Sequence, residues 1–573
     1  MESDSNWASS LRVRALEARK KCGMVLDEER ILKLVPLDYP SDDRLIRLYS
    51  DLLRVRQGAP RLFSVQAIAL HTLSLASPRR GGVLPIPCGE GKTLISLLAG
   101  TVMGARKVLI LLPASLKSQN LHDQKTWKSD YRVHPDIEVC SYERLSAPQG
   151  ATYLEELGAD LIIMDEAHCL ADESSTRTRR LFDYFKAHPD TRAIVMSGTL
   201  TSRSLNDYAH LCQLALREGS PIPISYAVRE RWSAVIDPGT EFTELDWQQF
   251  RWMVTGNPIP EERKKVAQLS FQKRFRSTPG VVVSTGEDKI SSSLVYHRWH
   301  AGTDVAIDRA LRVLSEQWIL PNGDQLVDIL EYDRARKQLH LGFYYVREWP
   351  DGERDEEWLG ARRMWQASIR HILAQSRPGL DSPFWVESAA ESGKLSPRIL
   401  RVWADWVAVR ERTPPKTVTH WISDDRLRSM AEWTKAQKEP FILWYQNRAV
   451  GLRLQELGIS LYEPGGPPPN TPETCALSIA SFSEGIDGLQ RLFADQMILQ
   501  PPSSGRRWEQ MVARTHRIGQ TAHTVNVYFP AFFFGALLRG RREAGYIERT
   551  TGTRQKLIYG SRNDVYPYEE KQP

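Results

Sequence analysis

The feature that most constrains the fold of this chain is a series of short, continuously apolar runs, most of which are followed by a turn or a polar motif. Apolar residues at successive rather than alternate positions are typical of strands buried on both faces. Helical patterns lie between several of the runs, and strands that alternate with helices predict parallel α/β sheets. The runs occupy residues 107–113, 161–165, 193–197, 441–445, 476–481, 496–500 and 524–528.

These runs fall into two groups, which predict two parallel α/β lobes in tandem with a largely helical region inserted between them. We expect residues 1–55 to form an N-terminal helical segment, 56–212 the first lobe, 213–415 the inserted region and 416–573 the second lobe. A chain of 573 residues has room for this many domains.

The inserted region is rich in tryptophan, since 14 of the 17 tryptophans lie within residues 232–444. Core packing is the first interpretation of these large side chains, and base stacking by one or two of them is the alternative. One predicted helical face carries Trp365, Ile369, Ile372 and Leu373, which favours packing.

Composition excludes several classes of protein. Hydrophobic residues make up 41% of the chain and charged residues 25%, which excludes a wholly disordered or fibrous chain. The net charge of +6 permits nucleic-acid binding without requiring it. Six scattered cysteines without a CxxC pair argue against a zinc ribbon or a disulfide framework. Residues 527–538, the longest late apolar stretch, are too few to cross a bilayer, so we expect a cytoplasmic protein without a membrane partner.

A glycine-rich turn between an apolar run and a predicted helix indicates a phosphate-binding loop at residues 81–93, GGVLPIPCGEGKT. Backbone N–H groups in such a turn converge on phosphates, and Gly89 and Gly91 allow the chain to approach them closely. We expect Lys92 to reach the β- and γ-phosphates and Thr93 to hold Mg²⁺. The strict pattern has glycine at position 86, where this chain has isoleucine.

Two further apolar runs end in polar residues that suit nucleotide hydrolysis. In LIIMDEAH (161–168), Asp165 is placed to bind Mg²⁺, directly or through water, and Glu166 to polarise an attacking water. The next run is followed by Ser197 and Thr199, whose hydroxyls could sense the γ-phosphate and relay its loss.

In this order, PCGEGKT (87–93), DEAH (165–168) and SGT (197–199) resemble motifs I, II and III of the superfamily 2 helicase-like ATPases. The resemblance implies two RecA-like lobes that use ATP and Mg²⁺. It also places Gln66 where that superfamily has an adenine-reading glutamine. LLPASL resembles motif Ia, which implies that Pro113 and Ser115 contact the nucleic-acid backbone.

The second group of runs carries a segment, WEQMVARTHRIGQ (508–520), that is similar to motif VI of Swi/Snf-type DNA translocases. Gln510, Arg514 and Arg517 are spaced at i, i+4 and i+7, so we expect one helical face to carry all three. A guanidinium from this lobe would stabilise the γ-phosphate held by the other lobe and would couple hydrolysis to lobe movement.

SFSEGIDGLQ (481–490) resembles motif V, with Gly485 and Asp487 at the matching positions, between ATP and the nucleic-acid track. Motifs III and V lack the usual Swi/Snf wording, and the connection between the motif IV and motif V strands is short. This compact second lobe looks more like that of helicases carried by phages and mobile elements, which implies a bacterial or phage-infected host cell.

A basic segment, which includes Arg274 and Arg276, is either a solvated helix face or a DNA-contact surface. The leading hypothesis is an ATP-dependent DNA helicase or duplex-DNA translocase. Duplex DNA is favoured over single strands, and RNA is not excluded. The alternative is a nucleotide-gated DNA-binding or recruitment module with slow hydrolysis and no translocation, within a replication, recombination or defence assembly.

Overall fold

The first lobe is built on a five-stranded parallel sheet with strand order β1-β5-β4-β2-β3. In this computed structural model, residues 24–35, 41–201, 203–284, 290–326, 328–349, 352–375, 380, 383–412 and 414–566 are described. The strands are β1 (Gly82–Leu84), β2 (Val108–Leu112), β3 (Ile137–Ser141), β4 (Leu161–Asp165) and β5 (Arg192–Met196).

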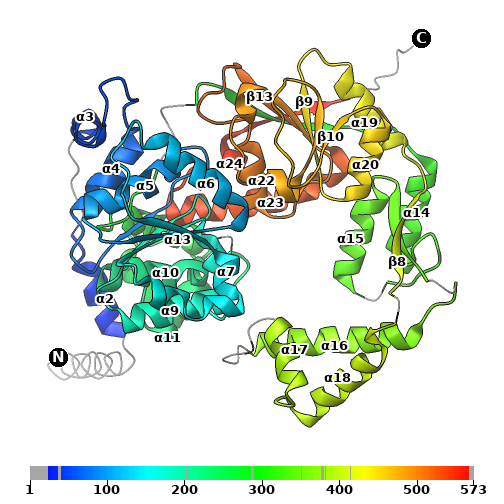
Figure 1. Cartoon of the computed structure of the whole chain (residues 1–573), viewed down its shortest axis with the longest axis horizontal. Helices are drawn as coiled ribbons and strands as arrows, with labels where there is room; N and C mark the ends of the chain where they lie inside the picture. The colour runs from blue at the N-terminus through cyan, green and yellow to red at the C-terminus, as the bar shows by residue number, and fades with distance from the viewer. Residues whose placement is uncertain are drawn as a thin grey trace, which may run out of the picture.

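Helices cover both faces of this sheet, at the left of Figure 1. Alternate residues of the central strands enter opposite cores: Leu109, Ile162 and Val195 enter one, and Ile110, Ile163 and Ile194 the other. This burial on both faces is the reason for the continuous apolar runs. The helices are α2 (Met24–Leu32), α3 (Asp42–Leu53), α4 (Ser64–Ser74), α5 (Lys92–Met103), α6 (Ala114–Trp127), α7 (Tyr142–Ser146), α8 (Tyr153–Leu157), α9 (Thr176–Ala187) and α10 (Asn206–Leu216).

The second lobe is built on a seven-stranded parallel sheet with strand order β10-β11-β9-β12-β13-β6-β14. Its strands are β6 (Ser293–Trp299), β9 (Phe441–Tyr445), β10 (Ser460–Tyr462), β11 (Cys475–Ser478), β12 (Asp495–Ile498), β13 (Thr524–Pro530) and β14 (Ser561–Val565). Its helices are α19 (Asp425–Lys435), α20 (Arg448–Glu456), α21 (Ile479–Phe482), α22 (Gly505–Val512), α23 (Phe534–Thr551) and α24 (Lys556–Tyr559). The α/β fold with two parallel-sheet lobes in tandem is therefore confirmed.

The sequence predicts one inserted region at 213–415 and the second lobe at 416–573. In the structure, the segment between the lobes does not form one inserted unit. Helices α11 (Tyr226–Ile236), α12 (Glu244–Phe250) and α13 (Arg263–Arg276) share the core of the first lobe. Strand β6 pairs with β13 and belongs to the second sheet. Strand pairing and shared cores, which join residues far apart in sequence, place these elements in the lobes.

The remaining inserted part has two small modules. In one, α14 (Val305–Gln317) and α15 (Ile329–Leu339) pack beside an antiparallel pair of β7 (Phe343–Glu348) and β8 (Lys416–Trp421). In the other, α16 (Glu356–Ala374), α17 (Pro383–Glu391) and α18 (Pro397–Arg410) form a helical bundle at the lower right of Figure 1.

The core-packing interpretation of the tryptophans is confirmed in the helical bundle and in the core of the first lobe. Trp365 and Trp403 pack together in the helical bundle with ring centroids 4.7 Å apart, and Ile372 lies in the same cluster. Trp232 and Trp247 are fully buried in the core of the first lobe.

Helix α23 joins the two lobes, because it starts after β13 and packs against α13 of the first lobe. Tyr546 donates a hydrogen bond of 2.6 Å to Asp237, and Arg549 donates one of 2.7 Å to Gln268. The N-terminal prediction of helices is met by α2 and α3, whereas residues 1–23 and 36–40 lie outside the described residues. Among the helices described, none is both long and apolar enough to cross a membrane.

Candidate active site

The glycine-rich loop runs from β1 to the N-terminus of α5. Gly89 (φ 93°) and Gly91 (φ 79°) have left-handed backbone, which favours glycine, and Gly91 is the N-cap of α5. A Cβ atom at Gly91 would lie 2.3 Å from the amide nitrogen of Gln66. The first N–H groups of α5, which have no partner within the helix, are therefore available at this loop, as a phosphate site requires.

Lys92, the first residue of α5, has a buried ammonium group. It donates to Glu166 Oε1 at 3.1 Å and to the carbonyl of Ile86 at 3.2 Å. The isoleucine that departs from the strict motif thus supplies its carbonyl and buries its side chain in the lobe core. Burial lowers the pKa of Lys92, but Glu166, Cys88 and Asp165 together outweigh burial, so the pKa is raised overall. Thr93 follows in the first turn and is half-buried.

Strand β4 delivers two buried carboxylates to the edge of the sheet. Asp165 is its last residue, and Glu166 follows with a left-handed φ of 49°. Burial raises the pKa of Asp165 to about 6, against the effect of Lys92. Burial also raises the pKa of Glu166, but Lys92 and His168 outweigh it, so this carboxyl stays ionised.

Ser197 and His168 hold the second oxygen of Glu166. Ser197 Oγ donates to Glu166 Oε2 at 3.3 Å, and His168 Nδ1 lies 3.3 Å from the same oxygen. Thr199 donates its backbone N–H to Ser197 Oγ at 3.1 Å. Ser197 thus contacts the candidate base directly, and Thr199 contacts Ser197 through its backbone. His168 is a site residue that sequence reasoning missed although DEAH contains it.

Gln66 lies on α4, and its amide is used by the backbone around the glycine-rich loop. Its Oε1 accepts from the N–H of Phe63 at 2.8 Å, and its Nε2 donates to the carbonyl of Gly91 at 3.1 Å. The side chain therefore positions the loop. Adenine recognition by Gln66 stays a prediction.

The second lobe brings Arg517 directly against the glycine-rich loop of the first. A Cβ atom at Gly89 would lie 3.0 Å from Arg517 Cβ. The Arg517 guanidinium pairs with Asp487 at 3.2 Å. Arg514 lies close by and is half-buried. Burial and Arg517 lower its pKa, while Cys88, Asp487 and Glu166 act in the opposite direction.

The expectation that one helical face carries Gln510, Arg514 and Arg517 is wrong in its geometry. Helix α22 ends at Val512, so only Gln510 lies on it. The following backbone tightens, with the N–H of Thr515 bonded to the carbonyl of Val512. Side-chain bonds from Thr515 and His516 to residues elsewhere in the lobe stabilise this turn, which periodicity alone cannot predict.

The motif V and motif Ia segments meet across the lobes. Gly485 has a φ of 76°, and a Cβ atom there would lie 2.6 Å from the carbonyl oxygen of Ser115. Ser115 lies in the first turn of α6, whose N-cap is Pro113. Any movement that separates the lobes therefore separates Gly485 from Ser115.

Of the two arginines proposed from sequence as nucleic-acid contacts, Arg274 is engaged inside the protein, whereas Arg276 is exposed. Arg274 donates to the carbonyls of Ile31 and Leu34 at the end of α2. The Arg276 side chain packs against Gly552, where a Cβ atom would lie 2.5 Å from Arg276 Cδ. The bonds of Arg274 favour a structural role for this residue, and a nucleic-acid contact by Arg276 stays a prediction.

Two further residues, to which the sequence analysis gave no role, also face this site. Cys88 Sγ lies 3.9 Å from Glu166 Oε1, and burial together with Glu166 raises the pKa of the Cys88 thiol against the opposing effect of Lys92, Arg514 and Lys556. Lys556 comes from the segment after α23 and is almost fully buried. No sequence signal marked it, since it lies beyond the last recognised motif.

The residues present suit a magnesium nucleotide. The buried atoms Arg517 Nε and Gln510 Oε1 have no hydrogen-bond partner within the described part of the chain. Thr93 and Asp165 offer the oxygen ligands that Mg²⁺ takes beside phosphate groups. Within the described residues, no group of three or more His, Cys, Asp or Glu side chains could hold a metal ion.

The fold and the site define a two-lobed ATPase with a phosphate-binding loop in one lobe and arginines from the other. Residues 59–202 match the family model of the type III restriction enzyme, res subunit, which is a helicase-like ATPase domain of superfamily 2. The matched range contains the three motifs of the first lobe. A comparison with curated proteins gave no match.

Proposed function

We propose that the protein is an ATP-dependent motor on duplex DNA, acting as a helicase or translocase. The observation that carries this proposal is the position of Arg517, which the second lobe places against Gly89 of the first. A guanidinium supplied across a lobe interface acts only when the lobes are together, so hydrolysis is coupled to their movement.

The resting site holds its base and its phosphate-binding lysine together. Lys92 and Glu166 form a buried pair at 3.1 Å. The triphosphate competes for Lys92, which releases Glu166 to accept a proton from the attacking water. Ser197 and His168 then keep the carboxylate oriented. Mg²⁺, held by Thr93 and Asp165, would neutralise charge on the phosphates.

The coupling path is short. Arg517 is tied to Asp487, which lies two residues beyond Gly485, and Gly485 contacts Ser115. A change of charge at the phosphates is therefore transmitted to the N-terminus of α6. Backbone N–H groups and hydroxyls at that position are suited to nucleic-acid phosphates.

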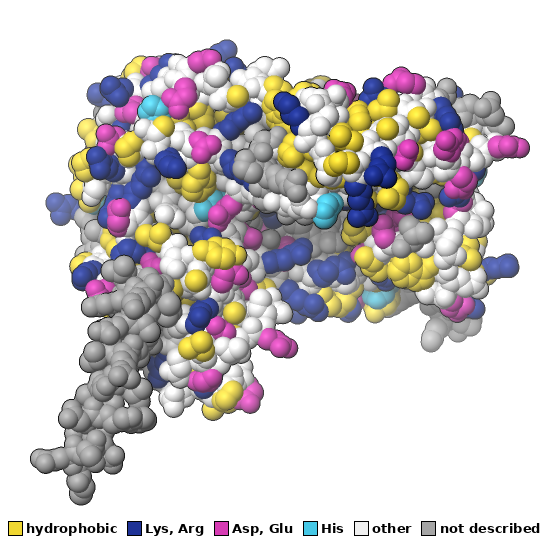
Figure 2. Space-filling view, turned by 90° about the horizontal axis from the view of Figure 1, so that it is seen from below, with side chains coloured by type: hydrophobic (Ala, Val, Ile, Leu, Met, Phe, Trp, Pro, Cys, Tyr) yellow, Lys and Arg dark blue, Asp and Glu magenta, His cyan; other side chains and the backbone are white. Residues whose placement is uncertain are grey.

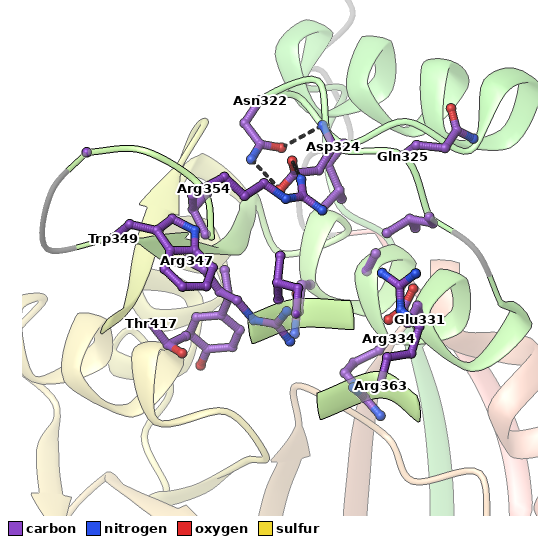
Figure 3. A pocket seen from close by; sticks show the side chains of 18 residues that line it. Asn322, Asp324, Gln325, Glu331, Arg334, Arg347, Trp349, Arg354, Arg363 and Thr417 are labelled. Carbon is purple, nitrogen blue, oxygen red and sulfur yellow. Dashed lines mark hydrogen bonds and ion pairs between the residues drawn. The ribbon is translucent and has the colours of Figure 1, made fainter. Parts of the chain in front are cut away.

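A basic pocket in the inserted region supports a nucleic-acid partner. It has a volume of ≈ 400 Å³ and is lined by Arg334 of α15, Arg347 of β7, Arg363 of α16 and Arg354, which precedes α16 (Figure 3). Arg354 pairs with Asp324. Arg334, Arg347 and Arg363 form no ion pair with a described residue, and we refer to these three residues as the arginine pocket. Lys and Arg side chains also surround the recessed centre of the face in Figure 2. Such unneutralised cations suit a phosphate backbone.

The sequence of motif VI supports movement along duplex DNA in the manner of Swi/Snf-type proteins. The compact second lobe favours an origin in a phage or mobile element, and with it the cytoplasm of a bacterial or phage-infected cell. Partners in replication, recombination or defence would suit such an origin.

One observation favours a second candidate, a nucleotide-gated recruitment module with slow hydrolysis. The pKa of Glu166 is lowered overall by Lys92 and His168 despite burial, and a carboxylate with a low pKa is a weak base. Hydrolysis would stay slow unless bound nucleic acid or a partner separates this pair.

ATP turnover without nucleic acid, with single-stranded DNA, with duplex DNA and with RNA separates these functions, with Glu166→Gln as the inactive control. Stimulation by duplex DNA together with displacement of a triplex-forming strand supports the motor. Turnover without displacement supports the recruitment module. Turnover that survives in Glu166→Gln contradicts the site itself.

A further inference from the structure

A buried polar segment connects α23 to α24. We call residues 552–557 the strap. Thr553 and Gln555 are 1% exposed and Lys556 is 6% exposed, although all three side chains are polar. Polar side chains are costly to bury without partners, so a segment of this kind indicates contacts that matter to function or to specificity of folding.

The strap touches the nucleotide motifs of both lobes. Thr553 Oγ1 donates to the carbonyl of Pro85 at the start of the glycine-rich loop, at 3.4 Å, and Gln555 Nε2 donates to the carbonyl of Gly198 at 3.3 Å. On the other side, Glu509 of α22 accepts the backbone N–H groups of Lys556 at 2.9 Å and Leu557 at 2.8 Å. The strap is therefore held between motif I, motif III and motif VI.

The side chain of Lys556 is a buried cation without a counterion. Among the described residues, none forms an ion pair with its ammonium group. Burial, aided by Arg517, lowers the pKa of Lys556, whereas Glu509, Glu90 and Cys88 act in the opposite direction. Two of these belong to the glycine-rich loop. A fully buried lysine is rare unless it is paired, because desolvation of an ammonium costs several kcal/mol.

Glu509 does not neutralise this lysine. Its two oxygens already accept two backbone N–H groups. Burial raises the pKa of Glu509 to about 7 despite the opposing effect of Lys556, so the carboxyl is only partly ionised near neutral pH. No ion pair joins the Lys556 ammonium to a described carboxylate, so this group is available to an anionic ligand.

We propose that Lys556 binds the terminal phosphates of ATP, and that the strap thereby makes the nucleotide site depend on a segment beyond motif VI. Lys92, Arg514 and Arg517 would then share the triphosphate with a fourth cation. Because Glu509 and Gly198 hold the strap from opposite lobes, bound ATP would draw the two lobes together at this point. This inference rests on the proposed ATPase function.

The test compares Lys556→Met with Lys556→Arg, which keeps the charge, and with Lys438→Met, an exposed lysine of the same lobe. Binding of MgATP and MgADP is measured by calorimetry with Glu166→Gln present in every chain, and melting temperatures are measured without nucleotide. We expect Lys556→Met to weaken MgATP binding about tenfold or more, with a smaller loss for MgADP. Lys556→Arg and Lys438→Met should bind like the parent.

Two outcomes overturn the inference: unchanged MgATP affinity in Lys556→Met, or an equal loss for both nucleotides together with a lower melting temperature, which indicates a structural lysine. Lys556→Gln replaces the methionine variant if that variant does not fold. If the parent with Glu166 intact hydrolyses no ATP, the proposed function fails. If that parent hydrolyses ATP but Lys556→Met does not change the affinity for MgATP, only the inference fails.

Discussion

Substitutions in the ion pair between Arg517 and Asp487 distinguish two effects: the orientation of the guanidinium by Asp487, and the action of the guanidinium on ATP hydrolysis. The guanidinium lies 3.2 Å from the carboxylate, and the Asp487 side chain is 55% exposed. Exposed pairs contribute about 0.2–1 kcal/mol, which corresponds to at most about a fivefold change in rate. Arg517→Ala, by contrast, removes the guanidinium that we propose to reach the phosphates, and such groups contribute about 10³-fold or more. We therefore expect Asp487→Asn to slow kcat slightly and Arg517→Ala to nearly abolish turnover.

The assay is ATP turnover at saturating MgATP and duplex DNA, with Arg491→Ala as an exposed arginine control from the same lobe. A loss in Asp487→Asn as large as that in Arg517→Ala would refute the reasoning, because Asp487 would then act on the reacting groups. Retention of turnover within about tenfold in Arg517→Ala would show that this guanidinium does not reach the phosphates.

Three further predictions follow from other parts of the structure. Gly91→Ala should lower the melting temperature and MgATP affinity, because its Cβ would lie 2.3 Å from the Gln66 amide nitrogen at a φ of 79°, and the additional change Gln66→Ala should restore part of the loss. A carboxyl whose pKa is raised on folding stabilises the protein at low pH and loses this effect as pH rises through its folded pKa. Since the pKa of Glu509 is raised to about 7, the parent should lose stability relative to Glu509→Gln between about pH 5 and about pH 8, as measured by thermal melting. Alanine at all three positions of the arginine pocket should reduce the slope of log Kd against log salt for duplex DNA by about 2 to 3. An unchanged slope would show that the pocket does not contact phosphates.

Strands buried on both faces could be predicted from sequence, whereas strands at partly exposed positions could not. The run that became β4 ends at Asp165, as expected, because two apolar cores flank it. Strand β6 alternates buried and partly exposed residues, and β14 is almost wholly exposed. Their place in the second sheet comes from pairing with distant strands, for which a single segment carries no signal.

The site was predictable where a motif specifies backbone geometry together with chemistry. Gly89, Gly91 and Lys92 form the expected loop because the left-handed glycines and the helix start are local properties. Lys556 could not be predicted, since its burial depends on contacts between both lobes. The internal engagement of Arg274 was hidden for the same reason.

The pairing of β6 has a consequence for synthesis and for the dissection of this protein. The contact between His297 and Asn526 joins residues 229 positions apart, and that between Arg298 and Asp564 joins residues 266 positions apart. At about 5–20 residues per second, β6 would wait roughly 10 to 50 s on the ribosome for its neighbours, with both edges unpaired. Such an edge invites association with other chains. A fragment that begins at residue 416 would leave β13 and β14 without the strand between them, so an isolated second lobe must begin before Ser293 and carry the inserted modules with it.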